Sequence, residues 1–390
     1  MRALLVGVVF GSGRTADESL DELAALVTSD GMLPVGREVC RRSRQDPEFF
    51  IGSGKADALA ERIKAEEIAV VVFDQELSAV QQRNLGEHWG VPVLDRTELI
   101  LDIFARRARS HEGKLQVELA RLEHLSARLV RGWTHLERQR GGIGVRGGPG
   151  EKQIELDRRM LTTRVRRLRV QLEQIRKQRR NRRRARQRRE VFSVSLVGYT
   201  NSGKSTLFNA LAKSDTYAAD QLFATLDTLS RRVRLPGGGW IVLSDTVGFV
   251  RDLPHQLVDA FQATLEETAE ADLLIHVVDA SAPDRDEQVL QVERVLAEIG
   301  ASEVPCLRVL NKIDLTGWPP EVERDSCGSI VKLMVSALTG AGIDDLREAI
   351  EQRVRARGGG VEPKISGPDA EIDGEPGLSG PIPETRQTVA

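Results

Sequence analysis

GYTNSGKST, residues 198–206, has the form G-x-x-x-x-G-K-[ST] of a phosphate-binding loop. The apolar run from Val191 to Val197 precedes it and predicts a buried strand, so the expected order is strand, loop and helix. Glycines allow the positive φ and close approach by which successive backbone N–H groups surround phosphate oxygens. Taken alone, the match fits a Gly/Ser turn before an ordinary helix equally well.

The residues of this loop have distinct expected roles. Lys204 would neutralise the β- and γ-phosphate oxygens, and Ser205 would bind Mg²⁺. Phosphate contacts are expected from Gly198, Tyr199, Thr200, Asn201, Ser202, Gly203, Lys204, Ser205 and Thr206.

A second motif, D-x-x-G, occurs in DTVGF at residues 245–249, after the apolar run from Trp240 to Leu243. There Asp245 would hold Mg²⁺ through water, and the Gly248 N–H would face the γ-phosphate. The nucleotide contacts expected here are Asp245, Thr246, Val247 and Gly248.

The segment FATLD, residues 223–227, lies between these motifs, where a mobile switch is expected. Thr225 is the candidate for a second hydroxyl on the metal, and the alternative is a capping or surface threonine. The nucleotide contacts expected here are Phe223, Ala224, Thr225, Leu226 and Asp227. The residues expected to act in catalysis are Lys204, Thr225 and Gly248.

Two further segments point to the base. NKID (Asn311, Lys312, Ile313 and Asp314) follows an apolar strand, and Asp314 could accept hydrogen bonds from guanine N1–H and the 2-amino group. Adenine lacks both donors, so ATP would leave a buried carboxylate unpaired, a discrimination of about four decades. Ser336 and Ala337, with Leu338, follow the strand Ile330 to Val335 and would offer N–H groups to O6. Four motifs in this order predict a P-loop domain that binds GTP and GDP with Mg²⁺.

The length of 390 residues allows two or three domains. The three cysteines form no C-x-x-C pair, so neither a disulfide framework nor a structural zinc site is predicted, and a cytoplasmic location is expected. Residues 1–10 lack a signal-peptide cleavage site and read as a buried strand. No apolar run approaches the roughly 18 residues that would span a bilayer.

The net charge of −2 conceals a strongly basic stretch. Residues 158–189 contain 16 Lys and Arg and a single acid, Glu173, so the rest of the chain carries −17. Such a concentrated basic element is typical of proteins that contact phosphate backbones, and the alternative is a solvated helix face.

Residues 1–110 are expected to form an N-terminal α/β domain with a parallel sheet, because three short apolar runs alternate with helical patterns. Residues 51–55, IGSGK, imitate a second phosphate loop. Phe49 stands where its first glycine should be and Ala56 where the metal-binding hydroxyl should be, so a second nucleotide site is the weaker alternative.

Residues 111–190 are expected to form a basic antiparallel helical hairpin, because leucines recur at steps of three and four in two stripes. Its loop, residues 141–150, contains six glycines, and Arg146 is its only charge. A long tip of small residues on a stiff basic stalk suits insertion into a narrow nucleic-acid crevice, whereas the alternative is a flexible loop without a partner.

Residues 191–357 are expected to form the Ras-like GTPase domain, with a mixed six-stranded sheet because the PGGG turn at 236–239 makes a hairpin. Residues 358–390 are rich in Gly, Pro and acids, and predict a disordered tail.

GGIGVRGGPGEKQIELDRR (residues 141–159), GYTNSGKST, FATLD and DTVGFVRDLPHQLVDAF (residues 245–261) together resemble the HflX family of ribosome-associated GTPases. The resemblance covers residues 1–357. It implies GTP-dependent binding to the large (50S) ribosomal subunit and its rRNA, with the hairpin reaching toward the peptidyl-transferase region, and the splitting of stalled or idle ribosomes. The chain departs from the family at Thr228-Leu229, where Pro-Thr is usual, and in its acidic tail.

Phe249 is the residue that sets the expected turnover. Ras-like enzymes usually place a water-orienting glutamine after D-x-x-G, and phenylalanine cannot orient water. The sequence therefore predicts a Mg²⁺-dependent GTPase that is slow alone and is activated by a partner. Arg251 and Arg231 could be arginine fingers in cis, although contact with solvent or ribosome is the favoured interpretation.

The expected protein is thus a monomeric, cytoplasmic GTPase that acts on ribosomes. The alternative is an RNA-binding assembly or chaperone module that uses GTP only as a structural ligand, although Ser205, Thr225 and Asp245 weigh against it. A GTPase acting at a membrane is disfavoured, because the sequence has no amphipathic anchor or lipidation signal.

Overall fold

The computed structural model describes residues 1–10, 16–139, 149–187, 191–213, 222–223, 229–251 and 262–357, and Met1–Gly359 form one unit. Thr225 and its neighbours Ala224, Leu226 and Asp227 lie outside the described residues. So do most of the Gly-rich loop and the whole tail from residue 358. The expectations for these segments therefore remain predictions.

The N-terminal domain is built on a parallel sheet of four strands in the order β2-β1-β3-β4. The strands are β1 (Arg2–Phe10), β2 (Leu33–Arg42), β3 (Val70–Phe73) and β4 (Val93–Asp95). The helices are α1 (Ala16–Ser29), α2 (Ser53–Ala65), α3 (Ala79–Trp89) and α4 (Arg96–Arg107). β2 was not predicted, because its residues are only half-buried and its sequence has no continuous apolar run.

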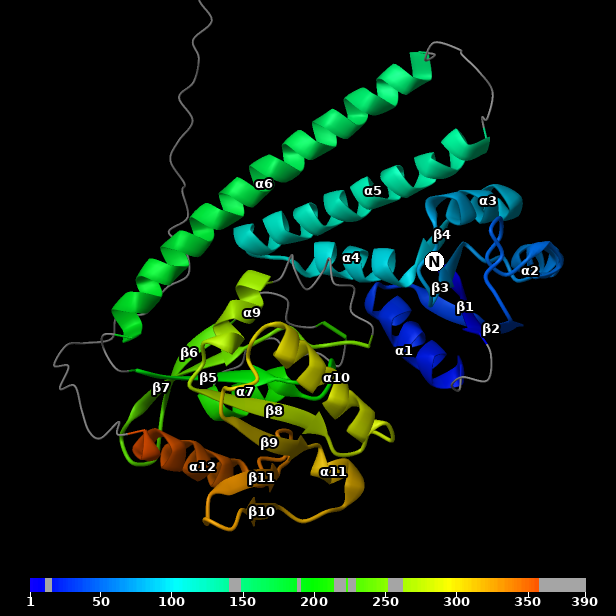
Figure 1. The fold of residues 1–390 in the computed structure, drawn as a ribbon. Helices are drawn as coiled ribbons and strands as arrows, with labels where there is room; N and C mark the ends of the chain where they lie inside the picture. The colour runs from blue at the N-terminus through cyan, green and yellow to red at the C-terminus, as the bar shows by residue number, and fades with distance from the viewer. Residues whose placement is uncertain are drawn as a thin grey trace, which may run out of the picture. The chain divides into compact units, whose positions relative to one another are not determined.

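β1 shows why this sheet needs helices on both faces. Leu5 belongs to the core formed with α1 and α4, whereas its neighbours Leu4 and Val6 belong to the core formed with α2 and α3. A central parallel strand is buried on both faces and is therefore apolar throughout. Figure 1 shows the helices of the two cores around this sheet.

Two long helices follow, α5 (His111–Gln139) and α6 (Pro149–Gln187), and Figure 1 shows them running alongside each other. Their contact is an apolar cluster that includes Leu115, Leu119, Leu168 and Leu172. At 1.5 Å per residue the arms are about 44 and 58 Å long. The stripe of leucines in each arm is therefore the seam between the two helices.

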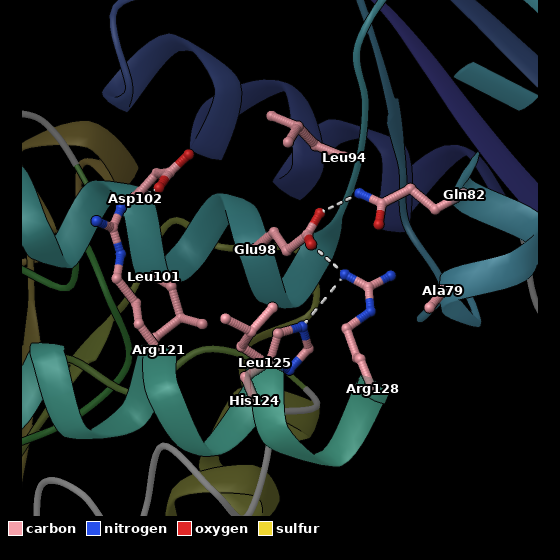
Figure 2. A pocket seen from close by; sticks show the side chains of 10 residues that line it. All are labelled: Ala79, Gln82, Leu94, Glu98, Leu101, Asp102, Arg121, His124, Leu125 and Arg128. Carbon is pink, nitrogen blue, oxygen red and sulfur yellow. Dashed lines mark hydrogen bonds and ion pairs between the residues drawn. The ribbon is translucent and has the colours of Figure 1, made fainter. Parts of the chain in front are cut away.

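A pocket of about 480 Å³ lies where α3, α4 and α5 meet. Arg128 on α5 reaches Glu98 and, at 3.4 Å, His124, as Figure 2 shows. It also donates to the Leu77 carbonyl at 3.0 Å. Asp95 lies 3.5 Å from the same guanidinium and also caps α4 by accepting from the Glu98 N–H. One buried cation on α5 therefore joins the hairpin to the N-terminal domain.

The second sheet has seven strands in the order β10-β11-β9-β8-β5-β7-β6. The strands are β5 (Phe192–Val197), β6 (Leu229–Arg234), β7 (Trp240–Asp245), β8 (Leu273–Asp279), β9 (Cys306–Asn311), β10 (Glu321–Arg324) and β11 (Ile330–Met334). It is mixed, because β6 and β10 run antiparallel to their neighbours. The expected count of six strands was wrong: β10 is polar and exposed, and it forms by pairing with β11 rather than by burial.

Helices cover both faces of this sheet. α7 (Lys204–Ala212) and α12 (Ile343–Ala356) pack on one face, and α9 (Gln262–Ala269) and α10 (Arg285–Glu298) pack on the other. A short helix, α11 (Ile313–Thr316), follows β9. None of the helices in the described ranges is long and apolar enough to cross a membrane.

Candidate functional site: a nucleotide pocket at the strand ends

The loop from Gly198 to Gly203 joins β5 to α7, as the sequence predicts. Gly198 has φ +151°, and a Cβ there would lie 2.2 Å from the Val277 carbonyl oxygen. Asn201 also has a positive φ, of 60°. The backbone therefore turns sharply, and α7 begins at Lys204 with its free N–H groups toward the loop.

Two side chains of this loop are buried without a hydrogen-bond partner. Thr200 Oγ1 and Ser202 Oγ are both enclosed, at 5% and 1% residue exposure. Buried polar atoms are normally satisfied, so unsatisfied ones in a loop of this shape indicate a ligand-binding position. A phosphate fits, because its oxygens can accept from hydroxyl and backbone donors alike.

Lys204 lies against the same loop. Its Nζ donates to the Tyr199 and Gly198 carbonyls at 2.8 and 3.2 Å. Burial lowers the pKa of Lys204 to about 8; nearby Asp245 opposes the shift and Lys312 adds to it. A phosphate beside this ammonium would compensate the lost hydration, so the site is prepared for an anion.

Ser205 and Asp245 come together at the candidate metal position. The Ser205 hydroxyl donates to Asp245 Oδ2 at 2.7 Å, although the two residues are 40 positions apart in the chain. A hydroxyl and a carboxylate are hard oxygen donors of the kind that Mg²⁺ takes beside substrate phosphates. These residues therefore fit Mg²⁺, whereas Thr225 lies outside the described residues.

The D-x-x-G segment is paired with the phosphate loop. Phe249 N–H donates to the Gly198 carbonyl at 3.1 Å, and its carbonyl accepts from Thr200 N–H at 2.6 Å. A Cβ at Gly248 would lie 2.8 Å from Thr200 Cγ2 and 2.9 Å from Lys204 Nζ, so only glycine allows this approach. The Phe249 ring is buried with Tyr199 and Leu265. It therefore points into the core and offers nothing to orient a water molecule.

The segments predicted to recognise the base contact the phosphate loop and each other. Asn311 Nδ2 donates to the Ser202 carbonyl at 3.0 Å, and Asn311 Oδ1 accepts from the Ala337 N–H at 2.9 Å. Ser336 Oγ donates to Asp314 Oδ1 at 2.5 Å. The structure thus brings three of the predicted segments together through one amide side chain. Leu338 is 78% exposed at the rim.

Arg251 corrects a prediction. It was expected to contact solvent or ribosome, but its residue exposure is 5% and its guanidinium lies 3.3 Å from Glu287 and 3.6 Å from Asp284 on and before α10. A guanidinium held by two carboxylates cannot also reach a phosphate as a finger. Arg231, in contrast, is exposed on β6.

Tyr199 has a partner that its sequence did not predict. Its hydroxyl donates to Glu22 on α1 and accepts from the Arg251 N–H at 2.8 Å. Burial and the adjacent Glu22 carboxylate raise the pKa of Tyr199. No sequence signal joins residues 177 positions apart, so this relationship could be found only in the fold.

The IGSGK segment differs from the nucleotide loop. Gly52 has φ +83° before α2, but Lys55 is paired with Glu38 at 2.5 Å and Ala56 is fully buried in the core. The position after the lysine therefore offers no hydroxyl for a metal, and the lysine itself is already paired with a carboxylate.

Comparisons with known proteins cover most of the chain. Family models match residues 17–105 (GTP-binding GTPase N-terminal), 107–186 (GTP-binding GTPase Middle Region) and 193–312 (50S ribosome-binding GTPase). The chain is 51% identical to GTPase HflX of Escherichia coli (strain K12), over 90% of this chain and 83% of that one. It is 44% identical to GTPase HflX of Caldanaerobacter subterraneus subsp. tengcongensis, over 90% and 80%. A crystal structure of the SsGBP and GDP complex superposes with a TM-score of 0.50 at 25% identity, covering 92% of this chain and 99% of that one.

Proposed function

Because the chain belongs to the HflX family of GTPases, we propose that it binds the large ribosomal subunit when loaded with GTP and separates stalled or idle ribosomes into subunits. In this proposal it acts in the cytoplasm as a monomer. The observation that carries it is the candidate nucleotide site, in which Lys204, Ser205 and Asp245 meet beside Phe249, whose buried ring cannot orient a water molecule.

The chain's own residues explain GTP binding. The N–H groups at the start of α7 and the Lys204 ammonium hold the phosphates, and Asp314 accepts from the guanine edge. Mg²⁺, when bound with GTP, would be held by Ser205 and, through water, Asp245 and would neutralise charge on the β- and γ-phosphates. Thr225 is proposed as a further ligand.

Hydrolysis is proposed to be slow until a partner acts. Phe249 is buried, so no side chain at this position can align the attacking water. The Phe249 backbone is instead bonded to Gly198 and Thr200, which holds the switch against the phosphate loop. The large subunit would raise the rate by ordering the Gly248 and Thr225 segments around the γ-phosphate.

The basic hairpin is the proposed ribosome contact. Arg164 and Arg169 on α6 are paired with Glu118 and Glu123 of α5, whereas Arg166 and Arg167 are exposed. Exposed arginines along a helix suit phosphate oxygens of rRNA, and the Gly-rich loop would enter the peptidyl-transferase region.

Sucrose-gradient profiles of intact ribosomes test the proposal. We expect free subunits with GTP and with a non-hydrolysable analogue, and intact ribosomes with GDP. Arg166→Gln/Arg167→Gln should weaken the splitting, whereas Arg83→Gln, which replaces an exposed arginine on α3, should not.

Equal GTPase rates with and without large subunits would contradict the role of the partner. RNA binding that is indifferent to the nucleotide would favour an assembly or chaperone module instead.

A further inference from the structure

The β6–β7 hairpin exposes several side chains on one face of its sheet. Val233, Ile241 and Leu243 point to the core beneath α7. The alternate residues Arg232 and Arg234 are exposed. Trp240, which lies opposite Arg234, is 47% exposed. β6 is also the terminal strand of the sheet. A basic, aromatic surface thus lies at the sheet edge, and we call Arg232, Arg234 and Trp240 the Arg–Trp face.

These side chains are arranged together. The Arg232 guanidinium carbon lies 5.0 Å from the centroid of the Trp240 ring, within the range of a cation–π contact. Because successive strand residues alternate between faces, Arg232, Arg234 and the cross-strand residue Trp240 share one face. In the part of the chain that the structure describes, no carboxylate forms an ion pair with Arg232 or Arg234.

Edge protection alone does not account for this composition. Charged residues do discourage one edge strand from pairing with another, and Lys is the usual choice. Here the charges are arginines, and they accompany a large exposed aromatic ring. At the opposite edge of the same sheet, β10 carries the acids Glu321 and Glu323 with one arginine, Arg324. The two edges therefore differ in chemistry although both need protection.

We infer that the Arg–Trp face binds a single-stranded segment of RNA. The two guanidinium groups would hold phosphates, since arginine offers a planar fork of donors that matches phosphate oxygens. Trp240 would stack on an unpaired base, a contact that tolerates any base. The inference rests on the proposed function, to which it adds a contact from the GTPase domain beside the contact from the hairpin.

Charge and the exposed ring favour RNA over a protein strand. A peptide added to the edge of β6 would bind its backbone and would gain little from two unpaired cations on one face. RNA uses both features, because its backbone is anionic and its unpaired bases have open ring faces.

Anisotropy of fluorescein-labelled RNA, measured with the full-length protein at several KCl concentrations, tests this inference. The probes are a 20-nucleotide oligouridine and a 20-base-pair RNA duplex. Trp240→Leu should weaken oligouridine binding by about tenfold and leave duplex binding and the salt dependence unchanged. Arg232→Gln/Arg234→Gln should lower the salt slope for oligouridine by about 1.4. Arg324→Gln, on the other edge strand, is the matched control and should behave as the unmodified protein.

The outcomes separate this inference from the proposed function. GDP affinity equal to that of the unmodified protein would show that each variant is folded. If both variants then bound oligouridine as the unmodified protein does, the inference would be wrong. Protection of the edge strand would then be enough to explain the exposed residues. If Trp240→Leu weakened both RNAs equally, stacking on an unpaired base would be excluded. If the variants lost oligouridine binding and the unmodified protein failed to split ribosomes, the role of the Arg–Trp face would be upheld and only the proposed function rejected.

Discussion

The Tyr199 hydroxyl accepts a hydrogen bond from the Arg251 N–H at 2.8 Å, and so connects the phosphate loop to the switch segment. The same hydroxyl donates to Glu22 of α1. Arg96 binds Glu22 at 2.7 Å and the Arg251 carbonyl at 3.2 Å. The backbone on both sides of the Arg251 residue is therefore held by one buried polar network that includes the N-terminal domain.

Tyr199→Phe should loosen the switch without emptying the nucleotide pocket. The change leaves the buried Arg251 N–H and the Glu22 carboxylate with one partner fewer, at a cost of about 1–3 kcal/mol. We expect faster amide hydrogen exchange in peptides covering residues 245–251 and little change in GDP affinity. Tyr217→Phe, at the chain's other tyrosine, is the control. Unchanged exchange in this segment would show that the network does not restrain it.

Asp314→Asn should change the base that the pocket prefers. The amide still accepts through its oxygen, but its NH₂ group is a donor. This donor would face the N1–H donor of guanine unfavourably, whereas it could donate to the C2 carbonyl of xanthine. GTP affinity should fall by about three to four decades, and xanthosine triphosphate should become the better ligand. Competition binding with both nucleotides measures this preference. Asp345→Asn, exposed on α12, should alter neither affinity. Retained preference for GTP would exclude Asp314 from the base contact.

Ser205→Ala should remove the contribution of Mg²⁺ to nucleotide binding. The hydroxyl lies 2.7 Å from Asp245 Oδ2, where a metal ligand is needed. With Mg²⁺ present, GTP affinity should fall at least tenfold, a loss of about 1.4 kcal/mol, whereas with EDTA the two proteins should bind alike. Ser244→Ala, on the half-buried face of β7, is the control. A deficit of equal size in EDTA would mean that the hydroxyl acts on the fold and not on the metal.

His276 should make the protein less stable in mild acid. Burial, together with the nearby positive charges of Arg308 and Lys204, lowers the pKa of this ring to about 4. Between about pH 6.5 and 4 the unfolded chain binds a proton that the folded chain does not, so stability falls as the pH falls, by up to about 3 kcal/mol.

Urea unfolding midpoints at several pH values measure this dependence. His276→Leu should show a smaller loss between neutral and mildly acidic pH than the unmodified protein, because the variant has no ring to protonate. His88→Gln serves as the control, since that ring is partly exposed beside Asp57. If His276→Leu kept the full acid sensitivity, carboxylates elsewhere would have to account for it.

Much of the candidate nucleotide site could be predicted from the sequence, because its requirements are local. Gly198 must take a backbone conformation that only glycine adopts freely, and a lysine and a serine must follow Gly203 at the helix start. Buried parallel strands are apolar throughout, so each motif could be placed at a strand end. The strands that were not predicted, β10 in this domain and β2 in the N-terminal domain, have partly or fully exposed residues that give no continuous hydrophobic signal.

By itself the sequence thus determined the order of the motifs, the guanine specificity they predict and the leucine seam of the hairpin, since each depends on residues a few positions apart. Tertiary structure alone decided that Arg251 is buried, that Tyr199 meets Glu22 and that Trp240 remains exposed beside the edge strand β6. The physical reason is that burial and hydrogen bonding depend on which distant segments pack together, and neither spacing nor composition specifies those contacts.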